Sequence, residues 1–585
     1  MGGGRGALRE ALFALLLAGL SLALYRDAFG VFFSSDDLLF LLRADGQVPW
    51  GMGTRRLLSV RVFFTTCWQL FGERPALFHL VILLLHAANA WLLARLARRL
   101  GLGERGAVVA ALCFLFSPVA FTCLHWISGV QDVMMATFAI AALLAWLRPG
   151  RAGELLALGL YLCAILSKEA AFMLPVAAFL LPERLLPAAG GAGRARRLRA
   201  LAALVPGLLL LYTGRALTPR LPGDPYESVI GVNILWNALT YSAWLLRVWV
   251  PFPDQVPQYE PSLWRWGLLL PALLGVLAWR RPRWRAGIGA AALMAVLFLA
   301  PVLPLVRHSY LYYLYLPLVP LWLLAAAGGE RLPRGFARWG LALPVLLLVV
   351  TGWRTQARSA QRLEGKLQAD PMLRYGAIVK DALRDLRAEP VAPAGDVLVV
   401  TPLVGEAVDL AAGVRAPANA QRVQFLPVDK ALYHGTAVPL FFPAVTSFRV
   451  LEVLPGLEAG RDAAWTRSEL YLLTGMTEFT YLGRGLAGRR EMARILFQWG
   501  RLPESLREID VLLALRPADP DLLHDRGVLA LAARDAVGAQ AIHERLAVLA
   551  AREAPPGAAA AAQRDFAAAM AGAGVAPLPV EAPAP

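Results

Sequence analysis

Eleven apolar stretches, each long enough to cross a membrane, constrain this chain more than any other feature of its sequence. The hydrocarbon core of a bilayer is about 30 Å thick and needs roughly 20 apolar residues in a helix. Such a pattern predicts a mainly α-helical, polytopic membrane protein, because helices satisfy their own backbone hydrogen bonds in lipid. The stretches lie near residues 8–26, 76–97, 106–124, 130–147, 153–167, 169–184, 199–217, 262–280, 284–304, 309–327 and 336–353.

The positive charge of the chain lies at the ends of these stretches. The formal net charge is +16, and arginines gather in the connectors after residues 97, 147, 184, 280 and 327. If residues 233–250 lie at the interface and do not cross, these connectors share one side, which the positive-inside rule makes cytoplasmic. The charge therefore indicates topology and not nucleic-acid binding. With a cytoplasmic N-terminus, eleven crossings place the chain after residue 353 on the extracytoplasmic face.

That C-terminal part differs in character from the predicted transmembrane domain, residues 1–353. Residues 354–485 predict an α/β region, in which Asp396–Thr401 is typical of a buried strand. Residues 486–553 predict tetratricopeptide-like helical repeats, because Arg534-Asp535 follows Gly500-Arg501 by the 34 residues of that repeat; an ordinary pair of amphipathic helices is the alternative. Residues 554–585 are rich in Ala, Pro and Gly, and we expect them to be disordered.

Four polar clusters interrupt the apolar pattern, and the predicted topology places all four at the outer ends of helices. Convergence of these clusters at one membrane face would create a site. The clusters are Asp36, Asp37, Arg43 and Asp45; His125, Gln131 and Asp132; Lys168 and Glu169; and Arg307, His308 and Tyr310. An acidic pair beside a bilayer is costly to desolvate, and it suits proton abstraction from a hydroxyl or cation binding.

Each cluster also has a purely structural interpretation. Asp36 and Asp37 fit the cap of a helix that begins at Leu38, and Asp132 fits the cap of the fourth span. Lys168 and Glu169 fit a pair that neutralises itself. The tyrosines near residue 313 fit an aromatic belt, and His79 and His86 on the apolar segment 76–97 are expected to form interhelical hydrogen bonds.

Six short motifs resemble those of a known family, and they occur in its order. The motifs are RPALFHL at 74–80, LLHAANA at 84–90, FSPV at 116–119, WISG at 126–129, LSKE at 166–169 and YLYLP at 313–317. Over residues 8–353 the chain is similar to bacterial GT-C membrane glycosyltransferases akin to the eukaryotic transmembrane and tetratricopeptide-repeat O-mannosyltransferases. The resemblance departs at Leu311-Tyr312, where relatives often carry an acidic residue and an arginine.

The resemblance implies a hexosyltransferase. Its substrates would be a polyprenyl-phosphate-linked donor and an extracytoplasmic acceptor hydroxyl on a protein, glycolipid or polysaccharide. It implies a multi-pass protein of a bacterial inner membrane, and mannose is one candidate sugar. Asp36 or Asp37 matches the acidic position of the first outer loop and is the candidate catalytic base.

The resemblance also suggests substrate-binding residues. Lys168 or Arg307 would stabilise the leaving phosphate, and Gln131 or Asp132 would orient the sugar. The remaining candidates for substrate binding are Arg43, His125, Glu169, His308 and Tyr310. A divalent cation on Asp36, Asp37 and Asp132 is an alternative to a metal-free base.

Two other functions fit parts of the sequence. A non-catalytic envelope scaffold with a degenerate GT-C fold would keep the helices and the outer tail. A transporter of lipid-linked sugars predicts inverted repeats and broken helices at the midplane. The polar clusters lie at helix ends and not at the midplane, which favours the enzyme.

Overall fold

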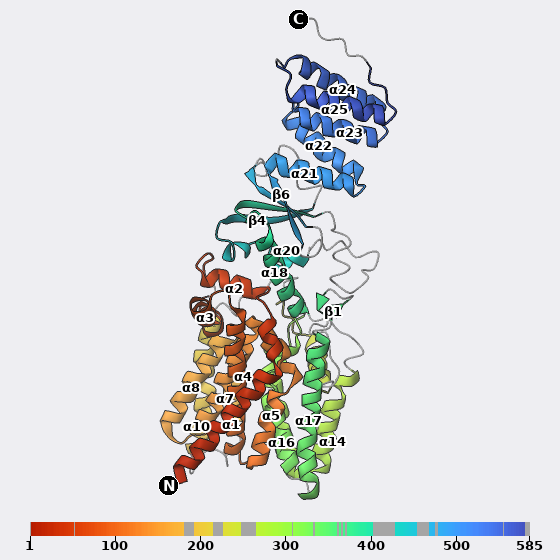
Figure 1. Cartoon of the computed structure of the whole chain (residues 1–585). Helices are drawn as coiled ribbons and strands as arrows, with labels where there is room; N and C mark the ends of the chain where they lie inside the picture. Colours follow the sequence, from red (N-terminus) through yellow and green to blue (C-terminus); the bar gives the residue numbers. More distant parts are fainter. Residues whose placement is uncertain are drawn as a thin grey trace. The chain divides into compact units, whose positions relative to one another are not determined.

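The computed structural model divides the chain into two compact units, residues 1–377 and 378–585, which are described separately (Figure 1). Helix α18 (Pro371–Ala388) runs across the division. The structure describes residues 2–51, 53–180, 192–213, 226–246, 265–306, 308–330, 334–359, 362–363, 367–368, 371–401, 427–452, 467–473, 478–553 and 555–578.

The first unit is almost entirely helical. Its first half contains α1 (Gly2–Leu24), η1 (Arg26–Gly30), α2 (Asp36–Ala44), η2 (Leu57–Val62), α3 (Phe63–Phe71), α4 (Pro75–Arg99), α5 (Glu104–Leu115), η3 (Pro118–Ala120), α6 (Phe121–His125), η4 (Ile127–Gly129), α7 (Val130–Trp146) and α8 (Gly150–Ser167). Its second half contains η5 (Glu169–Met173), α9 (Leu174–Phe179), α10 (Ala192–Ala202), α11 (Leu204–Thr213), α12 (Asn233–Leu246), α14 (Leu269–Arg280), η7 (Pro282–Trp284), α15 (Arg285–Leu299), η8 (Leu311–Leu314), α16 (Leu318–Glu330), α17 (Arg334–Ser359) and the two-residue strands β1 (Arg362–Leu363) and β2 (Leu367–Gln368).

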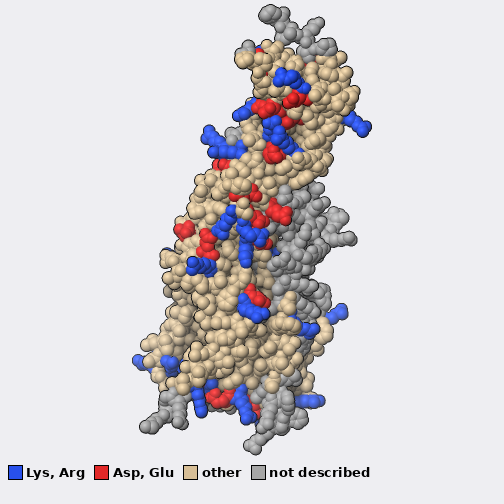
Figure 2. Space-filling view, viewed as in Figure 1, with Lys and Arg blue, Asp and Glu red and all other residues tan. Residues whose placement is uncertain are grey.

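Several of these helices are long and apolar enough to cross a membrane. Among the described residues there are four, Gly6–Leu24, Pro75–Arg99, Ile127–Trp146 and Gly150–Ser167, and the bent pair Glu104–Leu115 and Pro118–His125 makes a fifth if it counts as one span. Figure 2 shows charged side chains gathered towards the ends of this unit. The predicted mainly helical membrane fold is confirmed, while eleven crossings and their sidedness remain predictions.

Buried polar side chains tie the long helices of this unit together. On α4, His86 Nδ1 lies 2.6 Å from the Tyr315 hydroxyl and its Nε2 lies 3.1 Å from the Leu115 carbonyl oxygen. One turn away, Asn89 donates to the Val133 carbonyl oxygen at 3.0 Å. These bonds fix α4 against α5, α7 and the segment after η8. The predicted role of the apolar-face histidines is therefore confirmed, since His79 Nδ1 also lies 3.0 Å from a carbonyl oxygen, that of Leu124.

The second unit contains a small mixed sheet with the strand order β4-β3-β5-β6. Strand β3 (Gly395–Thr401) is central and pairs in parallel with β4 (Val445–Glu452) and β5 (Glu469–Leu473), while β6 (Phe479–Arg484) is antiparallel to β5. Val397, Val399 and Val400 are fully buried, as expected for a central parallel strand. The strand predicted near Asp396–Thr401 is confirmed. The short helices α20 (Pro427–Ala431) and η9 (Val438–Leu440) precede β4.

Five helices follow the sheet, and they pack on one another in sequence. They are α21 (Gly485–Gln498), α22 (Leu502–Leu515), α23 (Pro520–Ala532), α24 (Ala536–Ala551) and α25 (Ala558–Gly572). The helix pair that starts at Pro520 begins 35 residues after the pair that starts at Gly485. This spacing is near that of the predicted repeat, although the assignment to tetratricopeptide repeats remains a prediction.

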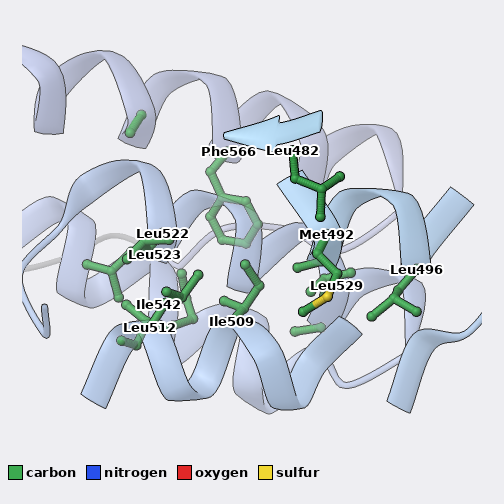
Figure 3. Close-up of a cluster of buried hydrophobic side chains, with 14 of the residues drawn as sticks. Leu482, Met492, Leu496, Ile509, Leu512, Leu522, Leu523, Leu529, Ile542 and Phe566 are labelled. Atoms are coloured by element: carbon green, nitrogen blue, oxygen red, sulfur yellow. The ribbon is translucent and has the colours of Figure 1, made fainter. Parts of the chain in front are cut away.

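Helix α25 corrects the expectation that residues 554–585 are disordered. Phe566 and Met570 of α25 are fully buried in the core that the preceding helices form (Figure 3). The phenyl ring of Phe566 fills the space that the missing side chain of Gly527 leaves on α23, where an added Cβ would lie 2.3 Å from the ring. Alanine has the highest helix propensity, so an Ala-rich segment with two large apolar residues on one face folds once a core is present. Residues 579–585 lie outside the described part.

Candidate functional site

Asp37 links two segments at the end of the bundle where α2 lies (Figure 1). Its carboxylate is 1% exposed and accepts hydrogen bonds from the backbone N–H of Ser34 at 3.0 Å, the backbone N–H of Ser128 at 2.7 Å and the Ser128 hydroxyl at 2.5 Å. Burial raises the pKa of Asp37 to about 7, against the opposite effect of the hydrogen bonds from Ser128 and Ser34. Asp37 thus fastens α2 to η4, the turn that precedes α7.

Asp36 occupies the first position of α2 and has a different environment. The helix begins at Asp36, two residues before the predicted start, and Ser35 precedes it with a positive φ of 52°. The Asp36 side chain is partly exposed, and within the described residues it takes part in no hydrogen bond or salt bridge. Burial raises the pKa of Asp36, and the positive charges of Arg56 and Arg43 oppose that shift. Asp36 is therefore a carboxylate with open acceptor positions beside two arginines.

Arg55 and Arg56 bring a third acidic residue into this region. Arg56 donates from Nε and Nη2 to the two carboxylate oxygens of Glu169, at 3.1 and 2.7 Å, and Arg55 Nη2 donates to Glu169 Oε1 at 3.2 Å. Neither arginine is among the site residues predicted from the sequence. A signal was present, because two adjacent arginines in a predicted outer loop run against the positive-inside rule and so need another explanation.

Lys168 pairs with Asp132 and not with its neighbour Glu169. The Lys168 ammonium lies 2.7 and 2.6 Å from the two oxygens of Asp132, and both side chains are buried. Lys168 has an extended backbone between α8 and η5, with φ −160° and ψ 134°, so that it and Glu169 reach different partners. This arrangement corrects two structural alternatives, a self-neutralising Lys168–Glu169 pair and a cap by Asp132, since α7 has no side-chain cap.

Aromatic rings cover the Lys168 ammonium and continue toward His308. The ammonium lies 4.8 Å from the ring centre of Tyr312 and 4.6 Å from that of Tyr313. Tyr310 stacks on Tyr312 with ring centres 5.1 Å apart and planes 15° apart, and the His308 ring lies 4.4 Å from Tyr310. The tyrosine run is thus packed into the site. Its residues 311–314 are buried in η8, which does not suit the alternative of an exposed aromatic belt.

The other predicted site residues have different surroundings from one another. Gln131 is 4% exposed, and its Oε1 has no hydrogen-bond partner within the part of the chain that the structure describes. Arg43 lies in the last turn of α2 and acts electrostatically on Asp36. His125 lies within α6, where Nδ1 is 2.9 Å from the Phe121 carbonyl oxygen and the two rings stack at 4.0 Å. Arg307 lies outside the described residues.

The three acidic residues suggested for a divalent cation do not form one cluster. Among the described residues, no group of three or more His, Cys, Asp or Glu side chains is arranged to hold a metal ion. The Asp37 carboxylate already accepts three hydrogen bonds, and Asp132 is held by Lys168. The three carboxylates predicted for a metal are thus engaged with different partners or stand apart.

Comparison with known proteins adds to this geometry, because part of the chain matches a family of enzymes. Residues 60–212 match the sequence model of the dolichyl-phosphate-mannose-protein mannosyltransferases. The predicted resemblance to GT-C membrane glycosyltransferases is confirmed by this match, and with it the class of enzyme. The matched segment includes Ser128, Asp132, Lys168 and Glu169 but begins after Asp36.

The chain is also similar to a protein of known structure. The crystal structure of ArnT from Cupriavidus metallidurans bound to undecaprenyl phosphate is similar, with 14% sequence identity and a TM-score of 0.39. The similarity covers 77% of this chain and 90% of that one. No curated protein sequence matches the chain.

Proposed function

We propose that the cluster around Asp36 transfers a sugar from a polyprenyl-phosphate-linked donor to an acceptor hydroxyl. The family match names enzymes that use such a donor, dolichyl-phosphate mannose. The observation that carries the proposal is the placement of one open carboxylate, Asp36, beside Arg56, a cation that Glu169 holds. Arg56 also acts electrostatically on Asp132, the carboxylate that binds Lys168. A transfer of this kind needs both a base and positive charge near the leaving phosphate.

Asp36 is the group that we assign as the base. The acceptor oxygen attacks the anomeric carbon, its proton moves to Asp36, and the bond between that carbon and the phosphate oxygen breaks, so that the electron pair leaves with the phosphate. Asp37 is less suited, because all its hydrogen bonds come from Ser34 and Ser128 and it has no room for an acceptor. The burial that raises the pKa of Asp36 makes this carboxylate a stronger base.

Lys168, Arg55 and Arg56 are the cations that we assign to the phosphate. Lys168 is held by Asp132 under two tyrosine rings, and the arginines are held by Glu169. Side chains fixed in this way need no rearrangement as negative charge develops, and fixed charges of this kind stabilise a transition state most effectively. Arginine and lysine both bind phosphate oxygens strongly through charge-assisted hydrogen bonds.

The aromatic residues and Gln131 are suited to hold the sugar. The stacked rings of Tyr310 and Tyr312 offer flat apolar faces, and a sugar ring has an apolar face of carbon-bound hydrogens. Gln131 Oε1 is buried without a partner among the described residues, and such an acceptor gains when a hydroxyl group donates to it. We assign Arg43 and His308 to the edge of the same site, beside Asp36 and Tyr310 respectively.

The finer features belong to the same proposal. We infer that the protein lies in a bacterial inner membrane, with the Asp36 end of the bundle and the region after residue 353 on the extracytoplasmic side. The donor sugar is a hexose and the acceptor a protein, glycolipid or polysaccharide. The helical region 486–553 is too short to offer a long concave surface, so we favour a glycolipid or polysaccharide acceptor over a protein.

Sugar transfer in isolated membranes tests the proposal. Membranes that contain the wild type or Asp36→Asn are supplied with radiolabelled polyprenyl-phosphate hexoses, and label in the non-lipid and glycolipid fractions is counted. Asp45→Asn is the matched control, because Asp45 directly follows α2 but accepts hydrogen bonds from Trp68 Nε1 and Gln47 Nε2. We expect Asp36→Asn to lose about 10²- to 10⁴-fold in rate, the usual contribution of a general base, and Asp45→Asn to keep it. Equal rates for wild type and Asp36→Asn would contradict the assignment.

A further inference from the structure

A cavity of about 280 Å³ lies among α7, α8, α9, α10 and the start of α11, and the proposed reaction does not use it. Its wall consists mainly of small or apolar side chains, such as Ala142, Ala157, Leu158 and Pro175. Glu154, Trp146, Tyr161 and Arg199 are its polar members. Such a lining, apolar with a few polar groups, is typical of sites for amphipathic ligands.

The cavity is separate from the Asp36 cluster. Asp132 and Trp146 both lie on α7, 14 residues apart, and a helix rises 1.5 Å per residue, so they are about 21 Å apart along the axis. On α8 the order is reversed, since Glu154 lies near the start of the helix and Ser167 at its end next to Lys168. The cavity thus occupies the opposite end of these helices, the end at which the sequence places the arginine-rich connectors.

The polar groups of the cavity wall differ in whether they have hydrogen-bond partners among the described residues. The Trp146 indole is 5% exposed, and its N–H has no hydrogen-bond partner within the described residues. A buried indole N–H without an acceptor is unfavourable. The Arg196 guanidinium lies 4.8 Å from the centre of the Trp146 ring and donates to the Arg148 carbonyl oxygen at 2.7 Å, so it fixes the ring without supplying that acceptor.

Positive charge exceeds negative charge at this point. Glu154 is the acidic residue of the cavity wall, and it faces both Arg199, at 2.6 Å, and Arg196, at 3.5 Å. Arg151, one turn before Glu154, adds a further positive charge near this carboxylate. The Arg199 side chain is 53% exposed and so can reach a ligand outside the cavity.

The surface beside the cavity is apolar. Leu155 of α8 is 68% exposed and Leu198 of α10 is 56% exposed. On a protein of this class, exposed leucines next to an arginine-rich helix end indicate contact with lipid at the boundary between acyl chains and headgroups.

We propose that this cavity binds one acyl chain of an anionic phospholipid, with the lipid phosphate beside Arg199 and an ester or phosphate oxygen accepting from the Trp146 N–H. The apolar wall suits the chain, the unpaired N–H needs an acceptor, and the excess of arginines favours a negative headgroup over a neutral one. Basic residues near the cytoplasmic leaflet attract anionic lipids by about 1 kcal/mol each. The site is independent of the proposed sugar transfer.

Native mass spectrometry of the purified full-length protein tests this site. The protein is taken from vesicles of phosphatidylcholine with an equal share of phosphatidylglycerol, and the lipid that remains bound is counted. Arg199→Gln removes the charge beside the cavity, while Arg105→Gln removes an exposed arginine of α5 outside it as a matched control. Ala157→Phe fills the cavity directly. Sugar transfer is measured on all variants to confirm that they are folded and active.

We expect phosphatidylglycerol to be retained in preference to phosphatidylcholine. Arg199→Gln should retain about fivefold less of it, the loss expected for one basic residue, and Ala157→Phe should retain almost none, while Arg105→Gln matches the wild type. The proposal would be overturned if both lipids were retained equally or if Arg199→Gln and Arg105→Gln lost the same amount of lipid. It would also be overturned if added polyprenyl phosphate were the only lipid that displaced the bound one. Because transfer is measured separately, failure here leaves the assignment of Asp36 intact.

Discussion

The hydrogen bonds of Asp37 should make it a structural residue, and this can be tested against its neighbour Asp36. Asp37→Asn keeps the shape of the side chain but replaces one acceptor oxygen by a donor NH₂ group. The two oxygens of Asp37 face the N–H of Ser34 and the N–H of Ser128, so either orientation of the amide sets one donor against another. Hydrogen bonds to a charged group contribute about 1.5–3 kcal/mol each. We therefore expect a loss of that size in the free energy of unfolding above the pKa of about 7, where Asp37 is ionised.

Ser128 offers a second variant that breaks the same interaction. Ser128→Ala removes the hydroxyl that donates to Asp37 but keeps the backbone N–H, and it should cost about 1.5–3 kcal/mol by the same reasoning. Because both variants break the same interaction, the double variant should cost less than the two single losses combined. Thermal unfolding in detergent, followed by the fraction of protein that remains monodisperse on gel filtration, measures all three. Fully additive losses, or none, would refute the role assigned to Asp37.

The pH dependence gives a further check on Asp37. Its pKa rises from 3.8 to about 7 on folding, so between these values the folded state binds the additional proton. The stability that this group contributes is therefore fully present below about pH 4 and is lost as the pH rises through about 7. The slope is about 1.4 kcal/mol per pH unit. Wild-type stability should fall from pH 5 to 7, and Asp37→Asn should lack this part of the slope. Identical profiles would contradict the raised pKa.

Two other predictions concern the buried ion pair and the last helix. Lys168→Met should cost about 3–5 kcal/mol of stability, because it leaves Asp132 buried and unpaired, and it should abolish sugar transfer. The double variant Lys168→Met with Asp132→Leu should recover the unfolding temperature but not the transfer activity. Recovery of both would refute a role of Lys168 in catalysis. Phe566→Ala should cost about 3–5 kcal/mol in the free energy of unfolding, since the ring is fully buried. Circular dichroism during heating measures this loss, and Val537→Ala on the exposed side of α24 is the control. Equal melting temperatures of the two variants would show that α25 is not part of the core.

Local sequence patterns predicted the features that depend on neighbouring residues. The mainly helical membrane fold, the buried strand around Val397–Val400 and the class of the enzyme follow from periodicity, hydropathy or short motifs, and all three are confirmed. The number of eleven crossings stays a prediction. The hydrogen bonds of His79 and His86 were predicted for the same reason, because a histidine on an apolar helix must find a partner inside the bundle.

Pairing among the charged residues could not be predicted in this way. Lys168 and Glu169 are adjacent in sequence, which favoured a pair between them. Because the backbone at Lys168 is extended, Lys168 instead binds Asp132, which is 36 residues away from it, and Glu169 binds Arg56, which is 113 residues away from it. The order of α25 was missed as well, since composition favours disorder until Phe566 meets the space beside Gly527.

The sequence by itself determined that this protein is a helical membrane glycosyltransferase with acidic and basic residues near the ends of its apolar segments, because crossing a bilayer forces a long apolar pattern that local composition records. Only the tertiary structure decided that Asp37 is committed to Ser34 and Ser128 while Asp36 keeps open acceptor positions. The reason is physical: a side chain's role as base or anchor depends on which donors from distant segments reach it, and one residue of helical rotation changes that set.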